Sequence, residues 1–244
     1  MNYFYKLPTD YEIDFRSEMV KFCLWEKINL NGTTTVSINY IRQHCGYSCD
    51  NRNKNSFSSY VRNLLKALID EKQILQVYGD DVTSVSGTSY LEFEILDKFY
   101  DVSTKAFAKL TSSVFDLIMS IECGLTKATI LKVYAYMRSH MIENSQQSYG
   151  FSSGLDNTIV KDLGLNRKTV DVCLSELADK GVFIKHTTGG YYANGSPKNA
   201  PNIYVLPDEN ADSNIKALLE DLKSRYRVDE FAPTLIPNIK NKKL

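Results

Sequence analysis

The chain has 244 residues, 43% of them hydrophobic, and its 29 basic side chains balance 29 acidic ones. The length and the hydrophobic content predict a globular protein with two separate cores and argue against a disordered chain. A net charge of zero argues against a protein that coats nucleic acid through an overall positive field, so any contact with nucleic acid has to come from local basic patches.

The cysteines and the hydropathy bear on the compartment. There are five cysteines, an odd number, and the first residues do not form a basic-then-apolar leader. We therefore expect reduced thiols in a cytoplasmic protein rather than a secreted disulfide framework. Charged residues interrupt every apolar run before it reaches the roughly 20 residues that span a bilayer, so we expect a soluble protein without a membrane partner.

The first 104 residues carry the pattern of a small helical domain that ends in a β-hairpin. Apolar residues recur every three or four positions in the helical segments and alternate in the strands. In chain order, the predicted elements are a helix over 15–28, a strand over 33–36, a helix over 38–45 capped by Ser37, a helix from about 56 to 70, and strands over 74–78 and 90–95. This order is typical of a winged helix, in which the hairpin is the wing.

The same order of elements follows a second time, as an architectural repeat without sequence repetition. The predicted elements are helices over 111–121, 126–142, 155–163 and 167–180, strands over 182–187 and 202–206, and a further helix over 212–227. We therefore predict an α+β fold that is mainly α with small β wings, namely two winged helix-turn-helix domains in tandem plus a C-terminal helix. The expected boundaries are 1–104 and 105–208 for the two domains, and 209–244 for the C-terminal helix and its basic tail.

An apolar stripe marks the last predicted helix. Its members repeat at helical spacing and are Ile215, Leu218, Leu219, Leu222 and Tyr226. The stripe either packs on the core of the second domain, which we favour slightly, or pairs with its copy in a homodimer. A dimer would bear on function, because two-fold DNA-binding proteins read half-sites separated by one or more helical turns.

Four segments of the second domain carry a family resemblance. They are residues 126–142, 159–170 (IVKDLGLNRKTV), 176–181 (ELADKG) and 202–206 (NIYVL). On these residues, the span from Phe115 to Leu206 resembles the winged-helix domain of plasmid and phage replication initiators of Gram-positive bacteria and of related regulators. The opening Tyr3 to Pro8 is similar to the start of some of these initiators. The resemblance implies a DNA-binding scaffold that initiators share with repressors and activators.

The start of the predicted helix 167–180 provides the candidate reading residues. In a helix-turn-helix the first residues of the second helix reach base edges, and here they are Asn166, Arg167, Lys168 and Thr169. In the alternative, Asn166 only caps the helix and the two cations lie in water, although cations at a helix N-terminus oppose its dipole. The predicted wing adds side chains for contacts with the backbone or the minor groove, and these are Lys185, Tyr191, Tyr192 and Lys198.

The first domain has a local excess of basic residues between positions 42 and 66. Its candidate DNA contacts are Arg42, Arg52, Lys54, Ser59, Arg62 and Lys66. Short polar side chains among them suit phosphates and bases, whereas the alternative is a polar loop beside a solvated helix face. Asp80 and Asp81 in the first wing would repel phosphate, so this wing either points away from DNA or serves another purpose.

No pattern indicates catalysis, a cofactor or a metal. His44, Cys45 and Cys49 lie close in sequence, but a structural zinc site normally has a second pair of ligands, so buried thiols are the better interpretation. No nucleophile and base occur at motif spacing, and the sequence has no glycine-rich phosphate loop. We expect a binding protein rather than an enzyme.

The leading hypothesis is a sequence-specific binder of double-stranded DNA that initiates replication of a plasmid or mobile element. A transcriptional regulator on the same scaffold is the alternative within binding proteins, and the sequence does not separate the two. An adaptor whose winged helices hold other proteins is the alternative of another class, which the zero net charge and the acidic first wing permit. The candidate partners are double-stranded DNA, a second copy of the chain, and other replication or transcription proteins.

Overall fold

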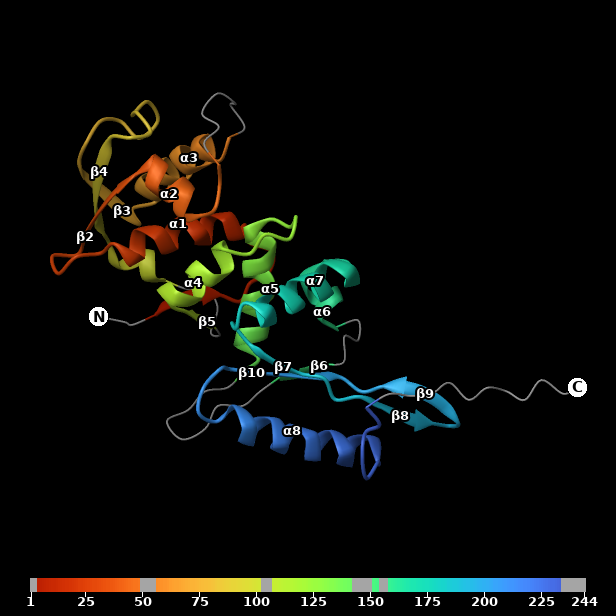
Figure 1. Ribbon diagram of the computed structural model, residues 1–244. Helices are drawn as coiled ribbons and strands as arrows, with labels where there is room; N and C mark the ends of the chain where they lie inside the picture. The colour runs from red at the N-terminus through yellow and green to blue at the C-terminus, as the bar shows by residue number, and fades with distance from the viewer. Residues whose placement is uncertain (1–3, 49–55, 102–106, 142–150, 154–157, 234–244) are drawn as a thin grey trace, which may run out of the picture. The chain divides into compact units, whose positions relative to one another are not determined.

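The computed structural model describes residues 4–48, 56–101, 107–141, 151–153 and 158–233. Among these residues it is a mixed α+β structure with eight α-helices and several small antiparallel sheets (Figure 1). The chain divides into two compact units, Met1–Ser139 (unit 1) and His140–Leu244 (unit 2). In the described part of the chain, no helix is both long and apolar enough to cross a membrane.

Unit 1 contains the first five helices. Its elements are β1 (Tyr5–Pro8), α1 (Phe15–Glu26), β2 (Thr33–Ser37), α2 (Ile38–His44), α3 (Phe57–Asp70), β3 (Ile74–Tyr78), β4 (Tyr90–Ile95), the 3-10 helix η1 (Asp97–Tyr100), β5 (Phe107–Leu110), α4 (Ser112–Met119) and α5 (Lys127–Ser139). The expected cap of α2 is confirmed, because the Ser37 hydroxyl accepts a hydrogen bond from the backbone amide of Tyr40 at 3.1 Å.

Two sheets organise unit 1. Strands β2, β4 and β3 form an antiparallel sheet in that order, so the hairpin β3–β4 pairs with the strand that precedes α2. The register pairs Thr33 with Glu94 and Ile74 with Ile95. A second sheet pairs β1 with β5, which places Tyr5 opposite Leu110. The sequence pattern did not predict β1 and β5, each of which has only four residues.

The division between the units differs from the expected boundary at residues 104 and 105. Helix α5 packs against β5 and α1, and α4 packs against α5. The Tyr134 hydroxyl on α5 donates a hydrogen bond to the carbonyl of Lys109 on β5, and Phe115 on α4 stacks on Phe22 of α1 with ring centroids 4.2 Å apart. Since β5 is tied to β1, these contacts bring α4 and α5 into unit 1, and the observed boundary follows Ser139.

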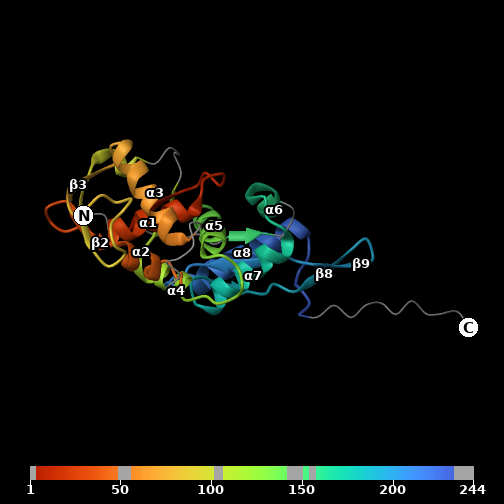
Figure 2. The ribbon, with the colours of Figure 1, turned by 90° about the horizontal axis from the view of Figure 1, so that it is seen from above.

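Unit 2 contains two helices joined by a short linker, a sheet, a hairpin and the last helix. Its elements are β6 (Phe151–Ser153), α6 (Thr158–Leu163), α7 (Arg167–Asp179), β7 (Ile184–His186), β8 (Gly190–Ala193), β9 (Ser196–Asn199), β10 (Asn202–Val205) and α8 (Ala211–Tyr226). Strands β6, β10 and β7 form an antiparallel sheet in that order. The hairpin β8–β9 is inserted between β7 and β10 and reaches beyond this sheet (Figures 1 and 2).

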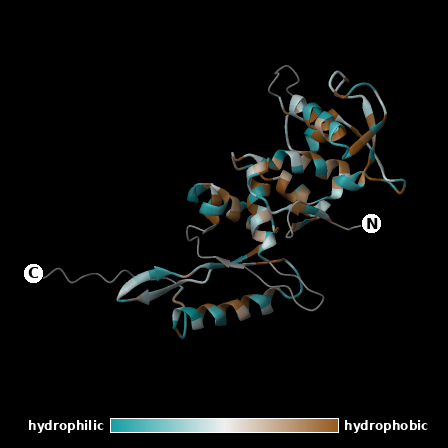
Figure 3. Cartoon of the chain, turned by 180° about the vertical axis from the view of Figure 1, so that it is seen from behind, coloured by the Kyte–Doolittle hydropathy of each residue, from teal (hydrophilic) through white to brown (hydrophobic). Residues whose placement is uncertain are grey.

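The apolar stripe of α8 packs on unit 2 itself, as we favoured. Ile203 and Val205 of β10 form a buried cluster with Ala211 and Leu222 of α8. The remaining residues of the stripe are partly buried against this cluster: Ile215, Leu218, Leu219 and Tyr226. Hydrophobic and hydrophilic residues both lie along α8 (Figure 3). The stripe is thus largely used within one chain, which leaves little of it for a copy in a second chain.

We expect Leu222→Ala to lower the free energy of unfolding of unit 2 by about 2–5 kcal/mol, because it leaves a cavity beside a fully buried side chain. Lys216→Ala on the exposed side of the same helix is the control and should change it by less than about 0.5 kcal/mol. Urea denaturation measures both values. Similar small losses for the two variants would contradict the packing of α8 on β10.

Candidate nucleic-acid interface

Helices α6 and α7 form a helix-turn-helix arrangement in unit 2. Residues 164–166 link them, and Gly164 takes a φ of +62°, a left-handed conformation that favours glycine. The two helices contact one another. The inner face of α7 is held by four buried side chains: Val170, Cys173, Leu174 and Leu177. This packing fixes the direction in which the first turn of α7 points.

The first turn of α7 places the predicted reading residues at the surface. Asn166 caps the helix, since its Oδ1 accepts a hydrogen bond from the Thr169 amide at 2.8 Å. Asn166, Arg167 and Lys168 are exposed and Thr169 is half-buried. Both functions of Asn166 are therefore compatible: its carboxamide oxygen caps the helix while its amide nitrogen can donate elsewhere.

The two cations of this turn are weakly compensated. The Arg167 side chain is 70% exposed, and its Nε lies 3.9 Å from Asp171 Oδ2, which is long for a hydrogen bond. Positive charge at a helix N-terminus opposes the helix dipole, so Arg167 and Lys168 do not stabilise α7. An anion bound at this turn would offset that repulsion. The arrangement suits contacts with phosphates and with acceptor groups on base edges.

The hairpin β8–β9 is a well-defined two-residue hairpin. Ala193 pairs with Ser196, and the two residues between them, Asn194 and Gly195, have φ values of +51° and +72°. Asn-Gly with positive φ at both positions is the type I′ turn that matches the twist of the flanking strands. The conformation of the tip is thus set by its own sequence. The sequence pattern predicted strands over 182–187 and 202–206 but not the two further strands β8 and β9 between them.

The predicted wing residues come from β7 and from the hairpin β8–β9, and they differ in exposure. Tyr192 is 46% exposed, and Lys185 and Lys198 are also exposed, so these three are available to a partner. Tyr191 is half-buried instead, because its ring packs on Tyr226 of α8 with centroids 4.6 Å apart. Successive strand residues point to opposite faces. The prediction that Tyr191 contacts DNA is therefore corrected: this side chain anchors the hairpin.

A strap from the C-terminal segment supports the same hairpin. Helix α8 ends at Tyr226, and its C-cap residue Arg227 has a left-handed φ of +56°. Ala232 then forms an isolated antiparallel bridge with Gly190. Each of these two residues donates its amide to the carbonyl of the other at 2.8 Å. Phe231 adds its ring to the Tyr191–Tyr226 pair. The sequence pattern did not predict this strap, because a single bridge has no periodic signature.

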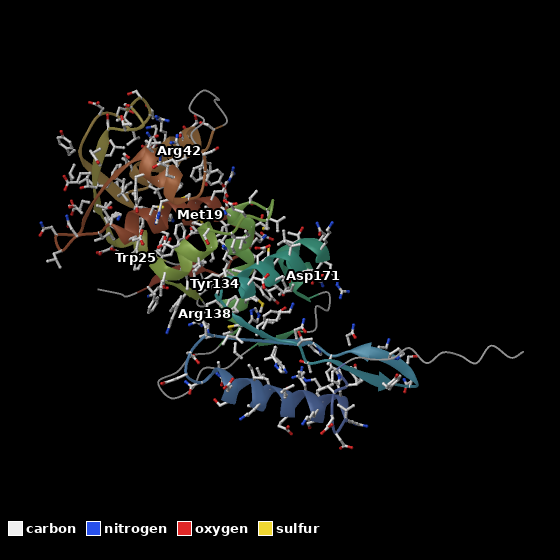
Figure 4. The ribbon with its side chains drawn as sticks, in the orientation of Figure 1. Met19, Trp25, Arg42, Tyr134, Arg138 and Asp171 are labelled. Carbon is white, nitrogen blue, oxygen red and sulfur yellow. The ribbon has the colours of Figure 1, made fainter. Side chains whose placement is uncertain are left out.

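In unit 1, the candidate residue Arg42 is not at the surface. It is 1% exposed, and its Nη1 lies 3.5 Å from the Ser58 hydroxyl of α3 (Figure 4). The prediction that Arg42 contacts DNA is therefore wrong for this structure. Counting the basic residues of the 42–66 segment did not show which of them are buried. Arg42 lies on the buried face of α2, next to Ile41.

The other candidates of unit 1 are mostly engaged within the unit. Arg62 donates from Nη2 to the Val85 carbonyl at 3.0 Å, and Lys66 pairs with Asp70 at 3.4 Å. The Ser59 amide donates to the Ser56 hydroxyl at the start of α3. Arg52 and Lys54 lie outside the described residues. Lys66 remains 56% exposed and, with Arg62, forms a weak basic surface rather than a concentrated one.

The first hairpin presents acidic and apolar groups instead. Both Asp80 and Asp81 are exposed, and hydrogen bonds from the Thr83 hydroxyl and amide lower the pKa of the Asp81 carboxyl, so it stays ionised near neutral pH. Four large apolar side chains on the sheet are exposed: Leu75 (49%), Val77 (50%), Tyr78 (68%) and Tyr90 (67%). This surface repels phosphate and suits contact with protein.

Cys45 is a buried thiol, as expected. Cys23 and Cys45 are fully buried with their sulfur atoms 3.5 Å apart, and burial raises the pKa of the Cys23 thiol well above its usual value. The His44 Nε2 lies 2.8 Å from Glu26 Oε2. Cys49 lies outside the described residues, among which no group of three potential metal ligands occurs.

We expect Gly189→Ala to destabilise unit 2 more than Gly181→Ala. Both glycines have positive φ, which costs an alanine about 1–2 kcal/mol. A Cβ on Gly189 would also lie 2.4 Å from the Ala232 carbonyl oxygen, whereas one on Gly181 meets nothing within 4 Å. Urea denaturation measures the free energy of unfolding of each variant, and the difference between the two losses measures the contact of Gly189 with Ala232. Equal losses would contradict this contact.

Comparison with known protein families and with curated proteins finds no match for this sequence.

Proposed function

We propose that this protein binds double-stranded DNA in a sequence-specific manner through unit 2, with α7 in the major groove and the hairpin β8–β9 as a wing. The observation that carries the proposal is the first turn of α7, where Arg167 and Lys168 are exposed on a helix fixed by its buried face, and the ion pair from Arg167 Nε to Asp171 Oδ2 is long at 3.9 Å. Donors in this position suit guanine O6 and N7 and phosphate oxygens.

The order of elements supports a winged-helix interpretation of unit 1. Helix α1, strand β2, helices α2 and α3, and the hairpin β3–β4 follow one another as a winged helix requires, and β2 pairs with that hairpin. In unit 2, the helix-turn-helix α6–α7 precedes the sheet and the hairpin in the same way. We infer two winged-helix modules with different roles.

We assign contacts with other proteins to unit 1. In this proposal only unit 1 has the adaptor function that the sequence suggested for the whole chain. Its hairpin carries Asp80 and Asp81 and its sheet exposes Leu75, Tyr78 and Tyr90, while Arg42 is withdrawn into the core. Acidic and apolar surface suits a protein partner, either a second copy of the chain or another replication or transcription protein.

Initiation of replication of a plasmid or mobile element is the biological role that we propose for this DNA binding, with transcriptional regulation as the alternative. The two roles use the same DNA contacts, so they are distinguished by the location of the target. Repeated sites at a replication origin beside the gene would favour initiation, whereas promoter operators elsewhere would favour regulation.

We expect Arg167→Ala to weaken binding to the target site by about 1–3 kcal/mol, with a smaller loss on random duplex. Arg225→Ala on α8 is a matched control, because it also removes an exposed arginine from an i, i+4 pair with an aspartate. Mobility-shift titrations of the full chain on duplexes from the DNA that flanks the gene, and on random duplex, measure both effects.

The proposed function fails if the wild-type chain binds neither duplex at low salt. If Arg167→Ala loses the same binding free energy on target and random DNA, Arg167 contacts phosphate and does not read a base. In that case the loss should shrink as salt increases, since phosphate contacts release counterions on binding.

A further inference from the structure

The sheet β2–β4–β3 of unit 1 packs on helices with one face only. Helices α1, α2 and α3 contact it from one side (Figures 1 and 2), and the side chains that point toward them are buried, among them Val36, Leu91 and Phe93. Successive strand residues alternate between the faces, and paired residues share a face. The register therefore places the alternate residues on the opposite side. We call this side the outer sheet face and define it by Thr35, Leu75, Tyr78, Tyr90, Glu92 and Glu94.

Large apolar side chains are concentrated on and beside this face. Leu75 is 49% exposed, and Tyr78 and Tyr90 are 68% and 67% exposed. Val77, which is 50% exposed, lies at the β-bulge between Gln76 and Tyr78. Among the described residues, four of the nine exposed large apolar side chains thus belong to β3 and β4. A concentration of this kind, unlike single scattered residues, marks a site of interaction.

The charges of the outer sheet face have one sign. Its two charged residues are Glu92 and Glu94, and the three strands contain no lysine or arginine. Glu94 is exposed, whereas Glu92 is half-buried and its Oε1 accepts a hydrogen bond from the Thr33 hydroxyl at 3.0 Å. Asp80 and Asp81 add negative charge in the turn after β3. The surface therefore attracts a basic partner and repels nucleic acid.

Two other modes of binding fit this surface less well. Strand β3 is an outer strand, but its β-bulge and the acidic turn after it interrupt the regular edge that an added strand needs. A second copy that docked through the same face would place like charges opposite one another, because a two-fold contact pairs a surface with itself. Both arguments favour a different protein that contacts the side chains of the face.

The dimensions of the outer sheet face match one α-helix. The central strand β4 has six residues. At about 3.3 Å per residue it is about 20 Å long, which is the length of a helix of about 13 residues. Strands β2 and β3 lie about 10 Å apart across β4, and a helix with its side chains is about as wide. A helix packed on a sheet is a common way to bury an apolar sheet face.

We propose that the outer sheet face binds an amphipathic helix of another protein, whose apolar stripe is bordered by lysine or arginine. The stripe packs on Leu75, Tyr78 and Tyr90, and the basic side chains pair with Glu92 and Glu94. This inference rests on the protein-contact role proposed for unit 1 and adds the chemistry of the partner.

Three fluorescein-labelled peptides of equal length test the chemistry of the partner, in fluorescence-anisotropy titrations with the full chain. The first has leucine at i, i+3, i+4 and i+7 and lysine elsewhere. The second replaces lysine with glutamate, and the third keeps lysine but replaces leucine with serine. We expect saturable binding of the leucine–lysine peptide and at least about tenfold weaker binding of the other two, because the face offers both apolar contact and negative charge.

Two variants, each with a matched control, assign the binding to the outer sheet face. Leu75→Ala removes apolar contact and should weaken binding of the leucine–lysine peptide about tenfold. Its control is Leu117→Ala, which truncates an exposed leucine of α4 and should leave binding unchanged. Glu94→Lys should weaken binding about tenfold or more. Its control is Glu122→Lys, the same charge change at an exposed position outside the sheet, which should weaken binding less than about twofold.

The outcomes that overturn the inference are distinct. They are no saturable binding of the leucine–lysine peptide, equal binding of either other peptide, and unchanged binding by Leu75→Ala. If Leu75→Ala loses its cooperative thermal transition, Glu94→Lys decides in its place.

Sedimentation of the wild-type chain and of Leu75→Ala tests a second copy as the occupant. A wild-type dimer that the substitution dissociates would assign the face to a second copy, which overturns the helical partner but retains a protein-contact role for unit 1. Duplex binding by unit 2 is measured separately by mobility shift, so its failure is distinguishable from a failure of this inference.

Discussion

The pairing of β1 with β5 is the constraint on which the arrangement of unit 1 depends. Four residues near the start of the chain align with four that lie about a hundred positions later, from Tyr5 opposite Leu110 to Pro8 opposite Phe107. Closing so long a loop costs conformational entropy, which must be offset by burial. Helix α5 provides it by packing on β5 and α1. The same pairing positions the Tyr5 hydroxyl beside the buried Glu18 carboxylate, to which it donates a hydrogen bond at 2.8 Å.

Local patterns in the sequence predicted the helices and half of the strands among the described residues, because periodicity and caps are properties of neighbouring residues. Ser37 and Asn166 cap helices where expected, and Asn194 with Gly195 forms the hairpin turn. Long-range pairings escaped prediction, as β1 with β5 shows. A strand of four residues has too few alternations to be recognised, and its partner cannot be inferred from spacing.

The candidate site was predictable to a similar degree. Exposure of Arg167 and Lys168 follows from helical phase, since Val170 and Leu174 mark the buried face. Arg42 and Tyr191 were misplaced for a common reason: residue type predicted a polar surface role, whereas helical phase buries Arg42 and the return of the chain after α8 covers Tyr191. A long side chain with an apolar body is compatible with either environment, so composition alone cannot decide.

The bridge between Gly190 and Ala232 also has a consequence for self-association. Outer strands of a small hairpin expose unpaired amide and carbonyl groups, which are templates for strand addition from another molecule. Ala232 occupies those groups on β8 at Gly190, and Phe231 covers the adjacent Tyr191 ring. The segment that follows α8 thus protects the edge of β8 at Gly190. The exposed side chains of the hairpin, Tyr192 on one face and Lys198 on the face of its cross-strand partner Tyr191, remain open to other molecules.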